Sequence, residues 1–276
     1  MTKTLLWIAI SILAVYALIP GIMIRMFGYR AFKRGSRQND LALTFDDGPD
    51  EVYTGRLLDM LQKHNVKATF FVVGKNAETH PELILRMHKE GHTIGIHNYV
   101  HHTNWLLLPQ QVRRQIEQTA EVVRRITGNA PIYYRPPWGI INVFDFMTLR
   151  KFRLILWSRI VGDWRKNNDK AKLKRKLIKR LKGGEVIVLH DSGETFGAYR
   201  HAPEQMLQAL DEYLQEVKGK GYSFVTIDEM FRNSQAKTEE NGVGSRMFIF
   251  LFMQWEKLFH LLFKVKKVDP ENPILQ

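Results

Sequence analysis

The chain has 276 residues, of which 45% are hydrophobic and 25% charged, and a formal net charge of +13. These proportions are ordinary for a globular protein of one large or two small domains, so intrinsic disorder is not expected. The absence of cysteine excludes disulfide bonds, thiolate metal sites and a cysteine nucleophile. The excess positive charge points to an anionic partner such as a lipid surface, an acidic polymer or nucleic acid.

The first feature along the chain is an uncharged stretch of twenty residues, LLWIAISILAVYALIPGIMI, at 5–24. A helix of this length can cross about 30 Å of hydrocarbon, so we expect a single-pass membrane anchor. A cleaved signal peptide and a buried soluble helix are the alternatives. Lys3 alone precedes the stretch, whereas five basic residues follow it: Arg25, Arg30, Lys33, Arg34 and Arg37. By the positive-inside rule this distribution would keep the following domain in the cytoplasm.

Between residues 38 and 233, short apolar runs alternate with helical patterns. Two helices are well delimited, because 81–90 begins with a proline and 109–127 is followed by Gly128. The alternation predicts an α/β fold with about seven parallel strands in a closed or nearly closed sheet, with helices outside. The expected strands are 41–45, 67–73, 92–96, 131–135, 152–157, 185–190 and 222–227.

The C-terminal part combines a polar stretch, 232–245, with an aromatic-rich run, 246–267, that ends in lysines. We interpret the polar stretch as a linker. The run is expected to form a membrane-interface helix or a helix packed on the catalytic domain. The predicted organisation is therefore a membrane anchor with its basic flank at 1–37, a catalytic domain at 38–233, and a linker with an apolar helix at 234–276.

Much of the positive charge is concentrated in residues 165–182, which contain ten basic residues and one acidic residue. We expect this stretch on an outer helix of the barrel, facing anionic lipid or an anionic wall polymer. No nucleic-acid-binding motif accompanies it, so nucleic acid is a disfavoured partner.

Polar residues follow the expected strands at their carboxyl ends, where barrel enzymes assemble their active sites. They are Asp46, Asp47, His97, His101, Arg135, Asp163 and His190. His97 and His101 are four residues apart, so a helical turn or a compact loop brings both imidazoles to one side. With one carboxylate they would supply three ligands and leave an open position, as catalytic zinc requires.

A metal would also explain the two adjacent aspartates in the sequence LALTFDDGP. One aspartate can bind the cation, which offsets their mutual repulsion, while the other acts as general base on water. His190 is a candidate acid whose ring Asp163 could hold, and Arg135 could orient the base. Three further residues are expected to contact a sugar substrate, two of them as flat apolar walls: Trp138, Trp164 and Pro137.

The segments TFDDGP, HNYVHH, YRPPWG, GDW and VLH, in this order, closely resemble the polysaccharide deacetylase family, also called the NodB-homology or carbohydrate esterase 4 domain. The resemblance covers roughly residues 40–231. It implies a distorted (β/α) barrel and metal-dependent removal of N-acetyl groups from the amino sugars of a glycan. It further implies Asp46 as catalytic base, Arg135 as the group orienting it, Asp47, His97 and His101 as metal ligands, and His190 as catalytic acid tuned by Asp163.

Three residues depart from the family pattern. Asn98 stands where Ser or Thr is usual, His102 where Pro is frequent, and Val188 where Leu is usual. These departures bear on substrate choice more than on catalysis. The expected metal is zinc, with cobalt or nickel also accepted by two histidines and one aspartate.

The expected partners are an acetylated glycan (peptidoglycan, chitin-like or lipid-linked) and a lipid membrane. A catalytically silent, membrane-anchored glycan-binding protein of the same fold is the alternative function. A cytoplasm-facing deacetylase of a lipid-linked sugar would agree with the basic flank. For the catalytic domain we favour the outer side of the membrane, toward the cell wall.

Overall fold

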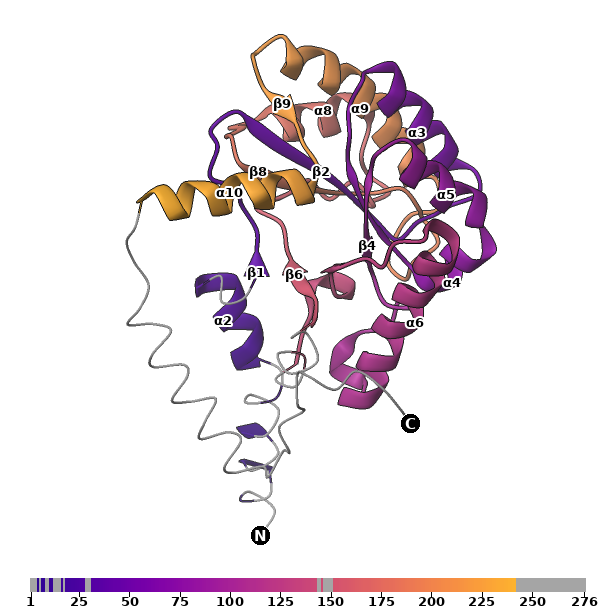
Figure 1. The fold of residues 1–276 in the computed structure, drawn as a ribbon, viewed down its shortest axis with the longest axis vertical. Helices are drawn as coiled ribbons and strands as arrows, with labels where there is room; N and C mark the ends of the chain where they lie inside the picture. Colours follow the sequence, from indigo (N-terminus) through magenta and orange to yellow (C-terminus); the bar gives the residue numbers. More distant parts are fainter. Residues whose placement is uncertain are drawn as a thin grey trace. The chain divides into compact units, whose positions relative to one another are not determined.

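The structure is a computed structural model. It describes residues 31–142 and 151–241 without a break, together with 18–27 and positions 4, 6, 7, 10, 11, 16 and 145. The chain divides into two compact units, 1–235 and 236–276. The first unit contains the whole sheet shown in Figure 1.

The strands of the described residues all pair in parallel, in the order β1-β6-β5-β4-β3-β2-β8-β7, with β9 beside the start of β2. Their bounds are Ala31–Phe32 (β1), Asp40–Asp46 (β2), Thr69–Val72 (β3), Thr93–Ile96 (β4), Tyr133–Tyr134 (β5), Arg153–Ile155 (β6), Arg159–Ile160 (β7), Glu185–His190 (β8) and Ser223–Phe224 (β9). One short segment, 153–160, joins the two sides of the sheet, because β6 pairs with β5 and β7 pairs with β8. The sheet therefore curls back on itself as a distorted barrel.

Most helices cover the outside of this sheet, and α3, α5, α4 and α6 follow one another around the strands in Figure 1, whereas α10 packs with Ile227 and Met230 against inner residues such as Ala42. Their bounds are Ile19–Phe27 (α2), Tyr53–Lys63 (α3), Gly74–Thr79 (α4), Pro81–Lys89 (α5), Pro109–Thr127 (α6), Lys170–Ile178 (α8), Ala202–Lys218 (α9) and Ile227–Asn241 (α10). Gly128 ends α6 at φ 79°, a left-handed conformation that glycine adopts without steric cost.

Strand β2 shows how the fold positions the site. Every residue of β2 is buried, because helices cover its outer face and other strands flank it. Leu41, Leu43 and Phe45 belong to the large core cluster shared with α3 and α9. Side chains alternate between the two faces of a strand, so Asp46 lies on the opposite, inner face. The strand therefore delivers a carboxylate to the carboxyl end of the barrel interior.

The structure confirms the seven expected strands, and the helices expected at 81–90 and 109–127 are α5 and α6. The sequence did not predict β1 and β7, which have two residues each. The helix expected over 165–182 is shorter, because the Asp169 side chain accepts the backbone N–H of Lys172 at 2.7 Å and begins α8 only there. Residues 232–241 of the expected linker are helical and complete α10.

The predicted membrane segments are covered only in part. Among the described residues, no helix is both long and apolar enough to cross a membrane. Within the stretch 5–24, α2 begins at Ile19, and its Ile24 is buried in a core cluster with Tyr134 and Leu154. The expected apolar helix at 246–267 lies outside the described residues.

Candidate active site

A pocket of about 280 Å³ lies at the carboxyl ends of β2, β4 and β8. Its lining includes five of the seven polar residues expected from the sequence: Asp46, Asp47, His97, His101 and His190. The other two, Arg135 and Asp163, are buried and contact the lining residues from behind. The predicted convergence of these residues is therefore present in the structure.

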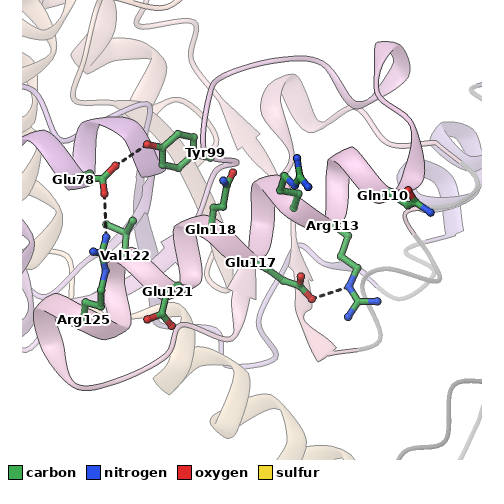
Figure 2. A pocket seen from close by; sticks show the side chains of 10 residues that line it. Glu78, Tyr99, Gln110, Arg113, Glu117, Gln118, Glu121, Val122 and Arg125 are labelled. Atoms are coloured by element: carbon green, nitrogen blue, oxygen red, sulfur yellow. Dashed lines mark hydrogen bonds and ion pairs between the residues drawn. The ribbon is translucent and has the colours of Figure 1, made fainter. Parts of the chain in front are cut away.

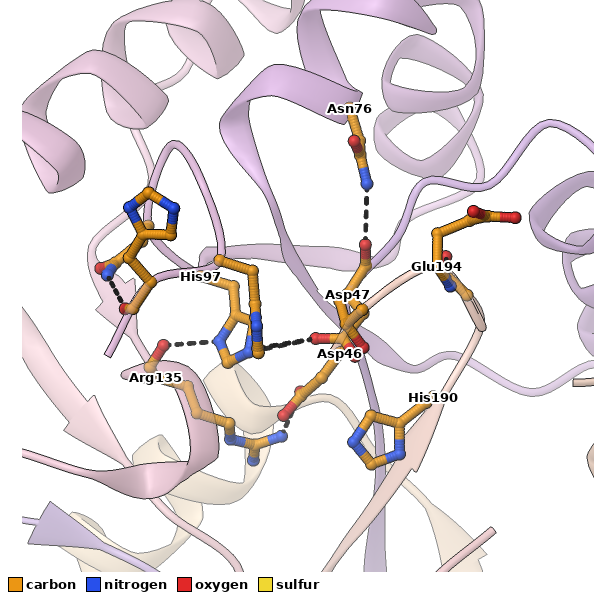
Figure 3. Close-up of polar contacts among 12 residues, drawn as sticks. Asp46, Asp47, Asn76, His97, Arg135, His190 and Glu194 are labelled. Carbon is orange, nitrogen blue, oxygen red and sulfur yellow. Dashed lines mark hydrogen bonds and ion pairs between the residues drawn. The ribbon is translucent and has the colours of Figure 1, made fainter. Parts of the chain in front are cut away.

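The two histidines expected as metal ligands face the same carboxylate oxygen. Asp47 Oδ1 lies 3.3 Å from Nε2 of His97 (Figure 3). The same oxygen lies 3.2 Å from Nε2 of His101. His97 Nδ1 donates a hydrogen bond to the backbone carbonyl oxygen of Arg135 at 2.7 Å, so its Nε2 presents a lone pair to the carboxylate. Asp47 Oδ1 is buried and accepts no hydrogen bond from the described residues. Because lone pairs facing one another repel, this arrangement fits a cation between them.

Asp47 is held in place at three points. Its backbone is in the left-handed region at φ 77°, its Oδ2 accepts a hydrogen bond from Thr195 Oγ1 at 2.7 Å, and its carbonyl oxygen accepts one from Asn76 Nδ2 at 2.9 Å. Burial opposes ionisation, but the neighbouring histidine charges, that of His190 first, hold the pKa of Asp47 below its ordinary value. Neither Thr195 nor Asn76 was predicted from the sequence; Thr195 reaches the site from the loop after β8, and Asn76 reaches it from α4.

Asp46 is fixed by a buried arginine. Arg135 Nη1 donates to Asp46 Oδ1 at 2.6 Å and to Thr44 Oγ1 at 2.7 Å, and the guanidinium lies 4.0 Å from the ring centre of Phe71. Arg135 is completely buried, and this burial lowers the pKa of its guanidinium. In the described part of the chain Asp46 Oδ2 accepts no hydrogen bond. One carboxylate oxygen is thus committed to orientation and the other is free for proton transfer.

His190 and Asp163 form the pair that the sequence indicated. The backbone N–H of His190 donates to Asp163 Oδ2 at 2.7 Å, and its Nδ1 lies 3.2 Å from Asp163 Oδ1. Burial by itself would lower the pKa of His190, but the charge and hydrogen bond of Asp163 raise it to about 10. The ring is therefore protonated at neutral pH and can donate a proton from Nε2.

The structure explains how asparagine is accommodated at position 98, where the family usually has Ser or Thr. Its φ is 61°, and asparagine tolerates this left-handed conformation better than most residues. Its Oδ1 accepts from Tyr134 OH at 2.9 Å, and its Nδ2 donates to the His102 carbonyl at 3.2 Å and to Asn104 Oδ1 at 3.0 Å. Asn104 Nδ2 in turn donates to Asp145 Oδ2 at 3.0 Å. This buried network, which the sequence did not predict beyond Asn98, supports the loop that carries the ligand histidines.

The residues expected to contact substrate divide into two groups. Trp138 and Trp164 line the pocket, and Trp138 is 40% exposed with its ring 4.3 Å from that of His101. Pro137 is buried in the turn before Trp138 and is not among the lining residues. Val188, one of the three departures from the family pattern, forms part of the pocket wall. The rim also contains residues that the sequence did not single out: Arg25, Trp157, Ile160 and Phe196.

A second hollow, of about 640 Å³, lies over the outer face of α6 (Figure 2). Several of its charged side chains are paired: Arg125 with Glu78 at 3.0 Å and Arg113 with Glu117 at 2.7 Å, and Glu78 also accepts a hydrogen bond from Tyr99 OH at 2.6 Å. None of the catalytic candidates lines it, so the smaller pocket is the candidate active site.

Comparison with known proteins agrees with this geometry. The sequence profile named Polysaccharide deacetylase matches residues 33–145. A peptidoglycan-N-acetylglucosamine deacetylase of Bacillus cereus is 36% identical over 220 residues, which are 79% of this chain and 77% of that protein. PgdA, a peptidoglycan-N-acetylglucosamine deacetylase of Listeria monocytogenes, is 37% identical over 69% of this chain and 38% of its own length. The crystal structure of the Bc1960 peptidoglycan N-acetylglucosamine deacetylase superimposes with a TM-score of 0.69 at 35% identity, covering 77% of this chain and 97% of that one.

Proposed function

This chain belongs to the polysaccharide deacetylase family and is an N-deacetylase of that class, and from this premise we propose that it removes N-acetyl groups from the amino sugars of peptidoglycan. The peptidoglycan deacetylases among its relatives support that choice of glycan. The observation that carries the proposal is the convergence of Asp47, His97 and His101 on one point, beside Asp46 and His190, in a single pocket.

We assign a divalent cation, with zinc the best match, to Asp47, His97 and His101. Their ligand atoms lie within 4.8 Å of one another, and among the residues that the structure describes the buried Oδ1 of Asp47 has no hydrogen-bond partner. When bound, the cation would lower the pKa of a water toward about 7 and polarise the acetyl carbonyl. Two imidazole nitrogens and one carboxylate oxygen suit zinc and would also accept cobalt or nickel.

In the proposed reaction the protein's own residues move two protons. Asp46 accepts a proton from the attacking water through Oδ2, while Arg135 keeps Oδ1 in place. As the carbon–oxygen bond forms and the carbon–nitrogen bond breaks, His190 donates a proton to the sugar nitrogen. Asp163 keeps the ring oriented and protonated until then. Acetate and a free amine are the products.

The apolar rim supports binding of a sugar. Trp138 and Trp164 both line the pocket. The Trp138 ring packs against the His101 ring, and the Trp164 ring packs against the His190 ring with 5.0 Å between ring centres. A pyranose bound between them would place its acetamido group between the metal ligands and the acid.

We further propose that the chain acts at the cell membrane, held there by the apolar residues that precede α2, with the catalytic domain facing the wall where peptidoglycan lies. The uncharged stretch supports the anchor, whereas the basic residues after it favour the opposite orientation. Alkaline phosphatase fused at the C-terminus decides between the two. An active reporter supports the outward orientation, and an inactive reporter at equal expression contradicts it.

The proposed substrate is tested by incubating the full chain with purified peptidoglycan and zinc, digesting the product with a muramidase and analysing the fragments by mass spectrometry. We expect fragments with free amino sugars, and none with the Asp46→Asn variant. Peptidoglycan left fully acetylated by the wild-type chain would contradict the choice of substrate.

A further inference from the structure

One cationic side chain on the rim of the catalytic pocket has no part in the chemistry described above. Arg25 of α2 lines the pocket together with Asp47 and His101. It comes from the segment expected to serve only as a membrane anchor and its flank. A guanidinium at the mouth of a catalytic pocket needs a separate explanation.

Arg25 is held at this rim by contacts on either side of it. Its neighbour Ile24 is 1% exposed and packs in a core cluster of the catalytic domain. Lys33 Nζ donates to the Arg25 backbone carbonyl at 2.7 Å, and Tyr16 OH donates to the Leu107 carbonyl at 3.1 Å. Helix α2 is therefore part of the catalytic domain's packing, and the backbone of Arg25 has a defined position.

The guanidinium itself lies close to the proposed metal site. Arg25 Nη2 lies 3.5 Å from the backbone carbonyl oxygen of Trp138, at the limit of a hydrogen bond. The Trp138 ring packs edge-on against His101, with 4.3 Å between ring centres. Trp138 therefore contacts both the Arg25 guanidinium and His101, a proposed metal ligand.

Arg25 is exposed, and within the described residues it forms no ion pair. Other arginines of this chain do pair with carboxylates, including Arg56 with Glu204 at 2.6 Å. The guanidinium presents planar, paired N–H donors that match the geometry of a carboxylate or phosphate. Arg25 lies at the pocket, and no carboxylate of the described residues pairs with it, so its donors are left for a ligand.

The pocket's own carboxylates do not prevent an anion from binding there. Asp46 is neutralised by Arg135, and Asp163 by the protonated His190. Asp47 faces the two ligand histidines and the proposed cation. The charge that remains at the rim is positive.

We propose that Arg25 binds an oxyanion, a carboxylate or a phosphate, carried by the glycan beside the acetamido sugar, and so makes the enzyme prefer acidic over neutral glycans. This inference rests on the proposed function, because it defines the substrate class of the same pocket. It also gives α2 a role in substrate choice.

The test measures binding by isothermal titration calorimetry with the full chain in detergent. The first pair of ligands is a peptide-free tetrasaccharide of alternating N-acetylglucosamine and N-acetylmuramic acid, which carries lactyl carboxylates, and chitotetraose, which is neutral. The second pair is N-acetylglucosamine 1-phosphate and N-acetylglucosamine. The variants are Arg25→Gln and Arg25→Lys. The matched control is Arg37→Gln, which removes the same charge from an exposed arginine that does not line the pocket.

We expect Arg25→Gln to weaken binding of the acidic ligand about tenfold to a hundredfold and to leave its neutral counterpart unchanged. Arg25→Lys should lie between, because an ammonium keeps the charge without the paired donors, and Arg37→Gln should match wild type. Weakening by Arg25→Gln that is confined to the tetrasaccharide pair identifies the oxyanion as a carboxylate. Weakening confined to the N-acetylglucosamine 1-phosphate pair identifies it as a phosphate. Equal weakening of acidic and neutral ligands, or no weakening, overturns the inference.

Acetate release is measured in parallel and separates this inference from the proposed function. Binding that depends on Arg25 without any acetate release would support the oxyanion site and contradict the deacetylation of these glycans. Acetate release together with binding that is indifferent to Arg25 would support the enzyme and overturn the role of Arg25.

Discussion

Asp46 and Arg135 form a buried ion pair in which Oδ1 and Nη1 are 2.6 Å apart and the side chains are 4% and 0% exposed. The backbone carbonyl of Arg135 also accepts the hydrogen bond from His97 Nδ1. One residue thus orients the proposed base with its side chain and a proposed metal ligand with its main chain. Because burying two charges costs desolvation energy, we explain this ion pair by its orientation of the proposed base and not by a gain in the stability of the fold.

Replacing Arg135 with methionine should leave the charge of Asp46 buried and uncompensated. We expect the free energy of unfolding to fall by about 3–5 kcal/mol. Urea denaturation followed by fluorescence measures it. Arg124→Met, which removes an exposed pair with Glu121, should change little. Equal losses in the free energy of unfolding for the two variants would contradict the larger cost expected for breaking the buried pair.

Metal content should separate ligands from the base. His101→Ala removes one of the three ligands, so the purified protein should lose zinc and activity together. Asp46→Asn should lose activity and keep the metal. His102→Ala serves as the control, since its exposed side chain neighbours His101 without facing Asp47. Plasma mass spectrometry of dialysed protein gives zinc per chain. Full zinc in His101→Ala would remove that residue from the site.

The pairing of Asp163 with His190 predicts a pH effect. In the wild type the raised pKa, about 10, keeps the ring protonated across the neutral range, and both activity and the pair's contribution to stability are lost as pH rises through that value. Asp163→Asn removes the charge that raises the pKa of His190, whereas burial, which lowers this pKa, remains. The alkaline limb of kcat should therefore move to lower pH in the variant. Asp59→Asn, at an exposed carboxylate, should leave the profile unchanged, and an unshifted limb in Asp163→Asn would contradict the assigned acid.

Asn98 should support the metal loop through its hydrogen bonds, separately from its backbone conformation. Asn98→Ala and Asn98→Gly both remove the contacts to Tyr134 and Asn104, so zinc affinity should fall about tenfold to a hundredfold in each. Only alanine adds backbone strain at φ 61°, so the alanine variant should also be less stable.

Asn65 provides the matched control for Asn98. Its φ is 47° and it is exposed outside the pocket. Asn65→Ala and Asn65→Gly should differ in stability in the same direction while zinc affinity stays at the wild-type value. Competition titration with a chelating dye measures the affinity. Unchanged affinity in both Asn98 variants would restrict this residue to a backbone role.

The parts of the site that could be predicted from the sequence are those that follow directly after a recognisable strand. Apolar runs such as LALTF end in the residues that carry the chemistry, and parallel strands bring those ends together, so Asp46 and His190 could be placed in one site. The family resemblance carried by five short motifs was confirmed, as was the barrel of parallel strands. Strands of two residues, such as β1 and β7, leave too short a pattern to detect.

The rest of the site depends on contacts between distant segments. Arg25 reaches the pocket only because Ile24 packs in the core, and the apolar stretch around it was interpreted as membrane-spanning. Thr195 contacts Asp47 across 148 residues of sequence. Polar residues of this kind are ordinary in loops, and no spacing marks them before the fold is known.

The most direct test of this account is acetate release by the full chain from peptidoglycan fragments, measured with zinc supplied, with zinc removed by a chelator, and with Asp46→Asn. The full chain is required because α2 contributes Arg25 to the pocket. The account predicts release that stops on chelation, returns when zinc is restored, and is absent in the variant although its zinc remains bound. Release that persists without metal, or in Asp46→Asn, would contradict it.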